Sequence, residues 1–327
     1  MLVTTTLQFA RHIGALFSKE TYFQQLESFV QDVETKLIEP LLGEELLTEL
    51  AQPGLDELHQ KVRLYAERAI VWAAFQEVQV GYLYQFGNGG MVKVMPKEAK
   101  SLALWEIDTI LSDTARKADA AIEQLINCLT REKENLPAWS TSEAYRKANA
   151  LLIPTTILLN EALPEVSATH SMLARLQAFM PRTERRFVAG VLGSELYEEL
   201  KAKLAGNITL TLAENQLWLH CRNLLGPITL WEALPSMSVL MLPDGIRIVS
   251  SFKGLNDQKA ASDSKITDLR MSLWKTAEDA KGELKRFLNK TASATVFPSY
   301  FNSGLYLAPG TSSWKEVDNS GKKHLRL

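Results

Sequence analysis

The stretch Leu26–Leu50, LESFVQDVETKLIEPLLGEELLTEL, decides the fold because the chain contains it twice. A shift of 150 positions places it on Leu176–Leu200, LQAFMPRTERRFVAGVLGSELYEEL, with the Leu-Gly pair and the apolar spacing kept. Each copy has the pattern of an amphipathic helix, a break at Gly43 or Gly193, and a second short helix. Glycine suits such a break because it accepts the positive φ at which many helices end. The sequence therefore predicts a tandem duplication.

The segments before and after this stretch are repeated as well. Residues 2–7 match residues 152–157 at the same shift, and their β-branched side chains predict a short extended entry segment. Each copy closes on a Pro-aromatic-Ser-Tyr pattern that begins at Pro137 or Pro298. Because Trp139 lies in this closing loop, we expect its side chain to be exposed. The repeat therefore covers nearly the whole chain.

A long apolar helix carrying a tryptophan lies inside each copy. The first is predicted over about 55–86 with Trp72, and the second over about 211–234 with Trp218. The last helix of each copy aligns at a shift of 162 and the closing pattern at a shift of 161, instead of 150. The change from 150 to 161 indicates an insertion of about 11 residues in the second copy, which we expect near residues 236–256.

A tight turn follows each long helix. Asn-Gly and Asp-Gly pairs accept positive φ, and an alternating segment comes directly after them, so a short β-hairpin or β-arm is predicted in each copy. The turn residues are candidate interaction sites: Asn88, Gly89, Gly90, Asp244 and Gly245.

The predicted fold class is mainly α, a tandem duplication of a helical domain in which each copy carries that short β-arm. The predicted domains are residues 1–149 and 150–307, followed by a polar tail over 308–327 for which a flexible conformation is expected.

The charge balance limits the classes of partner. A net charge of -2 and a pI near 6.3 argue against a general nucleic-acid coat and against a protein that lies on membranes. The halves differ: residues 1–150 hold 15 Lys and Arg against 21 Asp and Glu, and the remainder holds 21 against 17. This asymmetry would favour head-to-tail contact between copies of the chain, although modest imbalances between domains are common.

Targeting signals and cysteines point to a cytoplasmic protein. We find neither a secretory leader nor an apolar run near the roughly 20 residues that a membrane span requires. Cys128 and Cys221 fall in helical patterns of different copies, so buried free thiols are expected rather than a disulfide.

Patterns that carry catalysis are not found. The histidines lack metal-ligand spacing, Gly87–Gly90 lacks the context of a phosphate loop, and there is no G-x-S-x-G elbow. Two pairs of glutamates, Glu34 with Glu184 and Glu45 with Glu195, recur at the shift of 150, but helical carboxylates are usually solvated or cap a helix. We therefore predict no catalytic residue, no cofactor and no metal.

One charged feature separates the copies. Arg175, Arg182, Arg185 and Arg186 form a basic stripe in the second copy. The stripe is either a solvated helix face or a contact with an acidic protein surface or with phosphates. Without aromatic residues interleaved in the sequence, any contact with DNA is not expected to be sequence-specific.

The chain resembles an uncharacterised Bacteroidetes family of duplicated helical proteins from prophage-like gene clusters. The resemblance rests on the entry segment, the Leu-Leu-Gly-Glu-Glu-Leu helix end, the Trp helix, the Gly turn and the Pro-Trp-Ser closing. The helix–Leu-Gly–helix portion also resembles the small head–tail connector (adaptor) proteins of tailed phages. Those connectors are mostly single domains, so a fused pair departs from their pattern.

The resemblance implies a non-enzymatic structural protein, a phage or prophage head–tail connector or neck component. Its expected partners are phage portal or tail proteins or further copies of this chain, in the host cytoplasm and in the virion. The alternatives are a cytoplasmic bacterial scaffold protein with no virion role, and an enzyme that binds a small molecule in a cleft between the domains.

Overall fold

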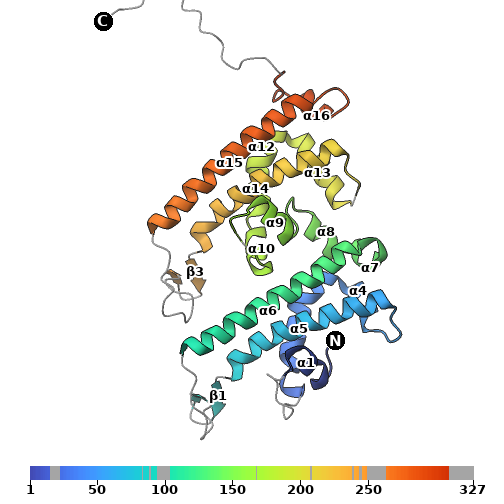
Figure 1. The fold of residues 1–327 in the computed structure, drawn as a ribbon, viewed down its shortest axis with the longest axis vertical. Helices are drawn as coiled ribbons and strands as arrows, with labels where there is room; N and C mark the ends of the chain where they lie inside the picture. The colour runs from blue at the N-terminus through green and yellow to red at the C-terminus, as the bar shows by residue number, and fades with distance from the viewer. Residues whose placement is uncertain are drawn as a thin grey trace, which may run out of the picture.

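The computed structural model shows two helical domains, one above the other along the long axis (Figure 1). It describes residues 1–14, 23–82, 84–87, 90–93, 104–166, 168–206, 208–237, 239–242, 245–248 and 263–308. Each domain has its own cluster of buried apolar side chains, and no described residue belongs to both clusters.

Domain 1 consists of short helices packed against one long antiparallel helix pair. Its elements are α1 (Thr6–Ile13), η2 (Phe23–Gln25), α2 (Glu27–Val33), the π-turn η3 (Glu34–Ile38), α3 (Glu39–Leu42), α4 (Glu44–Ala51), α5 (Glu57–Tyr82), β1 (Tyr84–Gly87), β2 (Gly90–Lys93), α6 (Leu104–Arg131), η4 (Lys133–Asn135), α7 (Pro137–Ser140) and α8 (Glu143–Asn149).

Domain 2 repeats this order. Its elements are α9 (Thr156–Ala162), α10 (His170–Gln177), α11 (Met180–Thr183), the π-turn η5 (Glu184–Val188), α12 (Ala189–Leu192), α13 (Ser194–Ala205), α14 (Leu212–Met237), β3 (Val239–Leu242), β4 (Gly245–Ile248), α15 (Asp263–Thr291) and α16 (Pro298–Phe301).

The duplicated stretch folds alike in both domains. Each copy runs through a π-turn of five residues and then breaks at Gly43 or Gly193, both of which have φ of 80°. The predicted break at glycine is confirmed, because this backbone conformation disfavours any residue with a Cβ atom. The helix predicted before the break is confirmed over 27–42 in domain 1, with the π-turn inside it, and in domain 2 it is interrupted by a turn at 178–179.

In space, the two domains are related by a translation and not by a two-fold rotation. Helix α5 packs against α6, and α14 packs against α15. In Figure 1 both pairs run in the same direction, with α6 above α5 and α15 above α14. A two-fold rotation would reverse either the direction or the order, so the arrangement is close to a translation along the long axis.

The two long helices correspond at a different shift from the duplicated stretch. Helix α5 begins at Glu57 and α14 at Leu212, a shift of 155. Trp72 therefore corresponds to Pro227 and not to Trp218. Part of the predicted insertion lies before α14, where α13 is longer than α4, and not only near residues 236–256. Apolar residues recur at every turn of a buried helix, so alignments that differ by a turn have similar patterns.

The β part of the predicted fold class also needs correction. The entry segments are not strands: Thr5 and Thr155 cap the helices α1 and α9 through their side-chain oxygens. The fold is helical nearly throughout. Extended pairing among the described residues is limited to four residues per strand, β1 with β2 and β3 with β4. A two-stranded ribbon of this length is marginal by itself, so a β-arm does not define the fold, which is mainly α.

Candidate functional site

Most of the predicted turn residues lie outside the part of the chain that the structure describes. These are Asn88, Gly89 and Asp244, while Gly90 and Gly245 begin the strands β2 and β4. The proposed role of the turns in interactions therefore stays a prediction, and the described side chains of interest lie on the helices.

Two buried glutamates mark the π-turns. Glu34 accepts a hydrogen bond from the backbone N–H of Leu2 at 2.7 Å, and Glu184 accepts one from Leu152 at 2.8 Å. Both carboxylates are buried, and the exposed fraction of Glu184 is 0%. The prediction that these glutamates are solvated or cap a helix is therefore wrong. Each one satisfies a backbone donor of the entry segment, which would otherwise be buried without a partner.

Glu184 has two further partners, the Lys201 ammonium at 2.6 Å and the Tyr197 hydroxyl at 3.0 Å. Burial together with the nearby Glu184 carboxylate raises the pKa of Tyr197, so this phenol stays protonated and donates its hydrogen bond. Domain 2 thus anchors its entry segment with a buried ion pair.

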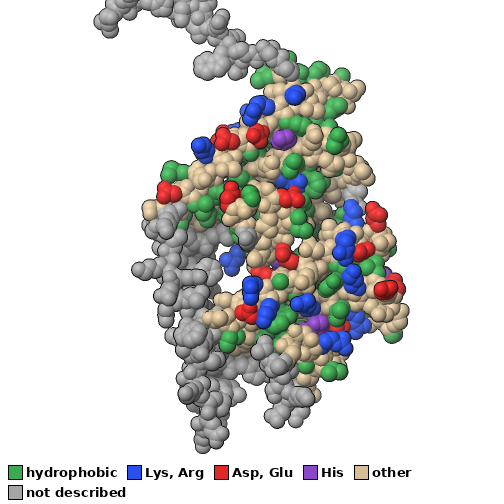
Figure 2. Space-filling view, in the orientation of Figure 1, with side chains coloured by type: hydrophobic (Ala, Val, Ile, Leu, Met, Phe, Trp, Pro, Cys, Tyr) green, Lys and Arg blue, Asp and Glu red, His purple; other side chains and the backbone are tan. Residues whose placement is uncertain are grey.

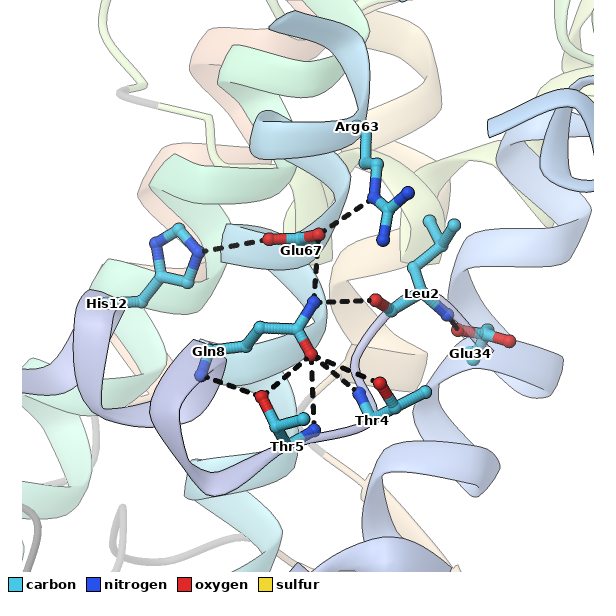
Figure 3. A network of polar contacts seen from close by, with 8 residues as sticks. All are labelled: Leu2, Thr4, Thr5, Gln8, His12, Glu34, Arg63 and Glu67. Atoms are coloured by element: carbon cyan, nitrogen blue, oxygen red, sulfur yellow. Dashed lines mark hydrogen bonds and ion pairs between the residues drawn. The ribbon is translucent and has the colours of Figure 1, made fainter. Parts of the chain in front are cut away.

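Domain 1 contains a second buried carboxylate, Glu67 on α5 (Figure 3). Its Oε1 accepts hydrogen bonds from Arg63 Nε at 3.0 Å and from Gln8 Nε2 at 3.1 Å. His12 Nε2 lies 3.9 Å from Oε2, which is too long for a hydrogen bond. Burial alone would raise the pKa of Glu67, but the contacts with these three side chains outweigh burial and hold the pKa below its ordinary value.

Gln8 links the two carboxylates of domain 1. Its Nε2 also donates to the backbone oxygen of Leu2 at 3.0 Å, and Leu2 donates to Glu34, so a continuous polar chain joins Glu67 to Glu34 (Figure 3). Gln8, Arg63 and Glu67 also line an open groove of about 650 Å³. Because the Glu67 carboxylate is already engaged by α1 and α5, its arrangement is that of a structural anchor.

Domain 2 has a charge of opposite sign at the same place. With the shift of 155, Glu67 corresponds to Arg222, whose exposed fraction is 8%. Arg222 donates to Glu161 of α9 at 2.9 Å and stacks on Trp218, with 4.6 Å between the guanidinium and the ring centroid. The position stays buried and charged in both copies, but its partners differ.

The predicted basic stripe is brought together in part. Arg182, Arg185 and Arg186 lie on α11 and η5 and surround a hollow of about 500 Å³, whereas Arg175 on α10 does not line it. Arg182 is also paired with Glu232 of α14. The stripe is thus a cluster of three arginines.

Aromatic rings from three separate elements lie beside these arginines. The Trp274 ring of α15 packs 4.9 Å from the Trp231 ring of α14 and 6.3 Å from the Phe187 ring of η5. Arg186 stacks on Phe187, and Arg270 stacks on Trp231 at 4.9 Å. Such stacking of guanidinium groups on rings is favourable and keeps the cations in place. We call this set the arginine–aromatic face: Arg182, Arg185, Arg186, Phe187, Trp231, Arg270 and Trp274.

The face is specific to domain 2. The buried positions of α6 and α15 correspond at a shift of 159 and not at the predicted 162, since Ala118 and Leu125 fall on Ala277 and Leu284. At shifts of 150, 155 and 159, domain 1 has Leu37, Gln76 and Ala115 where the three rings stand. Trp274 is 39% exposed and Met271, on the same side of α15, is 60% exposed. Figure 2 shows Lys and Arg interspersed with Asp and Glu over both domains on the face drawn there. A surface that combines exposed tryptophan, methionine and arginine has the composition of a binding interface.

The space between the domains is small. A cavity of about 80 Å³ is lined by residues of both domains, including Tyr145 and His170. The Ser171 hydroxyl donates to Asp119 across this contact at 2.6 Å. Trp139 of the closing loop is also buried here and donates to the Leu41 carbonyl at 3.0 Å, so its predicted exposure is wrong.

The described residues contain neither a candidate metal site nor a membrane-spanning helix. No group of three His, Cys, Asp and Glu side chains there could hold a metal ion, and no described helix is long and apolar enough to cross a membrane. Cys128 and Cys221 are free and buried, as predicted. Burial raises the pKa of both thiols, which therefore stay protonated and unreactive.

Fold and site together define a tandemly duplicated helical protein whose second copy carries an arginine–aromatic surface. The chain belongs to the family of unknown function DUF6712, whose model matches residues 18–149 and again residues 188–309. One match falls in each domain, so the family unit is the single repeat. Comparisons with curated proteins and with solved structures find no match.

Proposed function

We propose that this is a non-enzymatic structural or adaptor protein that acts through protein–protein contacts, with the arginine–aromatic face as its contact surface. The observation that carries the proposal is the gathering of arginines and aromatic rings from η5, α14 and α15 on one exposed surface of domain 2. Tryptophan and arginine are the residues that most often dominate binding energy at protein interfaces.

The specific form of the proposal is the role that the sequence resemblance implies, a phage or prophage head–tail connector or neck component. Its partners would be portal or tail proteins. Membership in DUF6712 supports a duplicated helical family and carries no information about a phage setting. The alternative within the same class is a cytoplasmic scaffold protein that binds through the same face and has no virion role.

An enzyme that uses a cleft between the domains is less well supported. Sites for small molecules usually measure about 300–1,000 Å³, and the cavity between the domains measures about 80 Å³. The larger grooves are open and lie on single domains, such as the groove near Glu67, where the buried carboxylate is already paired.

Site-specific photo-crosslinking tests the proposal. A photoreactive residue replaces Met271, next to Trp274, and as a control replaces Leu64, which is 45% exposed on domain 1. In the native host, we expect one defined cross-linked protein from position 271, and its loss in the Arg185→Ala/Arg186→Ala background. Equal cross-linking from both positions, or no effect of the arginine substitutions, would contradict the proposal.

The identity of the captured protein separates the two forms. After prophage induction, a portal, capsid or tail protein supports the connector role, whereas a cytoplasmic bacterial protein supports the scaffold role. Capture of nucleic acid instead of protein would show that the arginines contact phosphates, for which their planar donors are also suited.

A further inference from the structure

The duplicated stretch has acquired opposite charge in the two domains. At three positions on α2 and η3, Asp32, Thr35 and Lys36 correspond at a shift of 150 to Arg182, Arg185 and Arg186. At three further positions on α3 and α4, the acids Glu39, Glu44 and Glu45 correspond to Ala189, Ser194 and Glu195. Over these six positions domain 1 carries a net charge of -3 and domain 2 a net charge of +2. The same helical surface is therefore acidic in one domain and basic in the other.

The acidic side is a groove on domain 1. A depression of about 610 Å³ is lined by Glu39, Glu44, Glu45 and Glu143, together with two cations of α8. Glu143 is paired with Lys147. The other three glutamates form no ion pair within the part of the chain that the structure describes. We call this depression the acidic groove.

The basic side is similarly open. Arg185 and Arg186 are exposed and, among the described residues, form no ion pair; Arg186 is held by its stacking on Phe187. No ion pair between the described residues joins the arginine–aromatic face to the acidic groove of the same chain. If the two surfaces meet, the partner surface must come from a second molecule.

We propose that the arginine–aromatic face of one copy docks into the acidic groove of a second copy. This inference rests on the proposed function, because it names a partner for the same face. The contact joins two different surfaces, so it is head-to-tail: a pair of copies keeps one free groove at one end and one free face at the other, and further copies add at either end. The charge of the two halves, with net values of -6 and +4, favours the same orientation.

The charges on the two surfaces make this a salt-sensitive contact. Arg185 and Arg186 would place their guanidinium groups against Glu44 and Glu45, where planar donors and carboxylates form bidentate pairs. Exposed pairs of this kind are screened strongly once the Debye length falls to about 4 Å, which occurs near 0.5 M salt. Association is therefore expected at low ionic strength and is expected to weaken at high ionic strength.

Two complementary variants of the full chain test the proposal by sedimentation velocity. Arg185→Glu/Arg186→Glu reverses the charge of the face and keeps the groove, whereas Glu44→Gln/Glu45→Gln neutralises the groove and keeps the face. We expect the natural chain to form dimers and larger species at low salt, and each variant alone to be monomeric. An equimolar mixture of the variants retains one intact groove and one intact face, so it should form dimers and nothing larger.

The control is Lys285→Glu/Lys290→Glu, which makes the same change in net charge on the later part of α15. It should associate as the natural chain does. Circular dichroism shows whether every variant keeps its helical content. A natural chain that stays monomeric at low salt, variants that still associate alone, or a mixture that stays monomeric would each overturn the proposal.

These outcomes are separable from the proposed function. If the natural chain is monomeric but cross-linking from position 271 still captures another protein, the face is a contact surface for that protein and docking between copies is wrong. If position 271 captures no protein at all, including further copies of this chain, the proposed function itself is wrong.

Discussion

Domains 1 and 2 bury a charge at the same point of their long helices, but the charges have opposite signs. Glu67 is held by Gln8 and Arg63, whereas Arg222 is held by Glu161 and by the Trp218 ring. In both domains one partner of the buried charge lies on the first helix: Gln8 on α1 and Glu161 on α9. The two copies thus share their backbone and their apolar core, while each buried charge has partners that only its own domain provides.

The largest loss of stability is expected when the buried ion pair between Glu184 and Lys201 is broken. Glu184→Ala would leave the Lys201 ammonium and the Leu152 N–H without their partner. Removing one member of a buried pair costs about 3–5 kcal/mol, so urea denaturation should show that loss in domain 2. Glu195→Ala, at an exposed position on α13, is the control. A loss below about 1 kcal/mol would show that water replaces the carboxylate.

The comparison itself is tested by truncating the two opposite charges. Glu67→Ala leaves Arg63 and Gln8 without an acceptor, and we expect a loss of about 2–3 kcal/mol in the free energy of unfolding. Arg222→Ala should cost less, about 1 kcal/mol, because the Glu161 side chain is 53% exposed and water can replace its partner. Denaturant titrations measure both. Equal losses of unfolding free energy in the two variants would mean that the burial of each charge, and not the exposure of its partners, determines the loss.

Two helical glycines of domain 2 should respond in opposite directions. A Cβ atom on Gly226 of α14 would lie 2.9 Å from the Ala162 Cβ atom of α9, whereas one on Gly282 of α15 would meet nothing within 4 Å. We expect Gly226→Ala to destabilise the domain by about 1–3 kcal/mol through overpacking. Gly282→Ala should stabilise it by about 0.5–1 kcal/mol through helix propensity. Thermal unfolding of the two variants provides a paired measurement, and a stabilised Gly226→Ala would show that α9 and α14 move apart readily.

The smallest expected effect is a change of thermal stability with pH, caused by His170 at the contact between the domains. Burial lowers the pKa of His170, although Asp119 and Glu123 partly oppose this. The unfolded chain therefore binds the proton more readily, so the stability is present above pH 6.5 and is lost as the pH falls below it. We expect the midpoint of thermal unfolding to fall by about 1–3 °C more in the natural chain than in His170→Gln. Identical pH profiles would assign the effect to other groups.

The sequence predicts the repeat well because repetition is visible without knowledge of contacts. The breaks at Gly43 and Gly193 and the existence of both long helices follow from local patterns. The correspondence of the two long helices, which places Trp72 against Pro227, does not follow from their patterns, since a buried helix offers several similar alignments. The buried state of Glu34 and Glu184 is also missed, because a carboxylate that binds a backbone N–H 32 positions away leaves no local pattern.

The site shows the same limit. The arginines are adjacent in sequence and could be predicted as a stripe. Their aromatic neighbours Phe187, Trp231 and Trp274 come from three separate elements, and only the packing of η5, α14 and α15 brings them together. Aromatic residues that are not interleaved in the sequence are therefore interleaved in space. That difference supports the proposal that the stripe is a contact surface and not only a solvated helix face.

The π-turns also date the changes in this chain. A π-turn holds one residue more than the α-helical turn it replaces, and both copies have it at matching positions, Glu34–Ile38 and Glu184–Val188. The extra residue was thus present in the ancestral single repeat. The longer α13, the three arginines and the rings occur in one copy alone, so the copies diverged at these positions after the doubling. The order of events is therefore the extra residue first, then duplication, and then a divergence of the two surfaces.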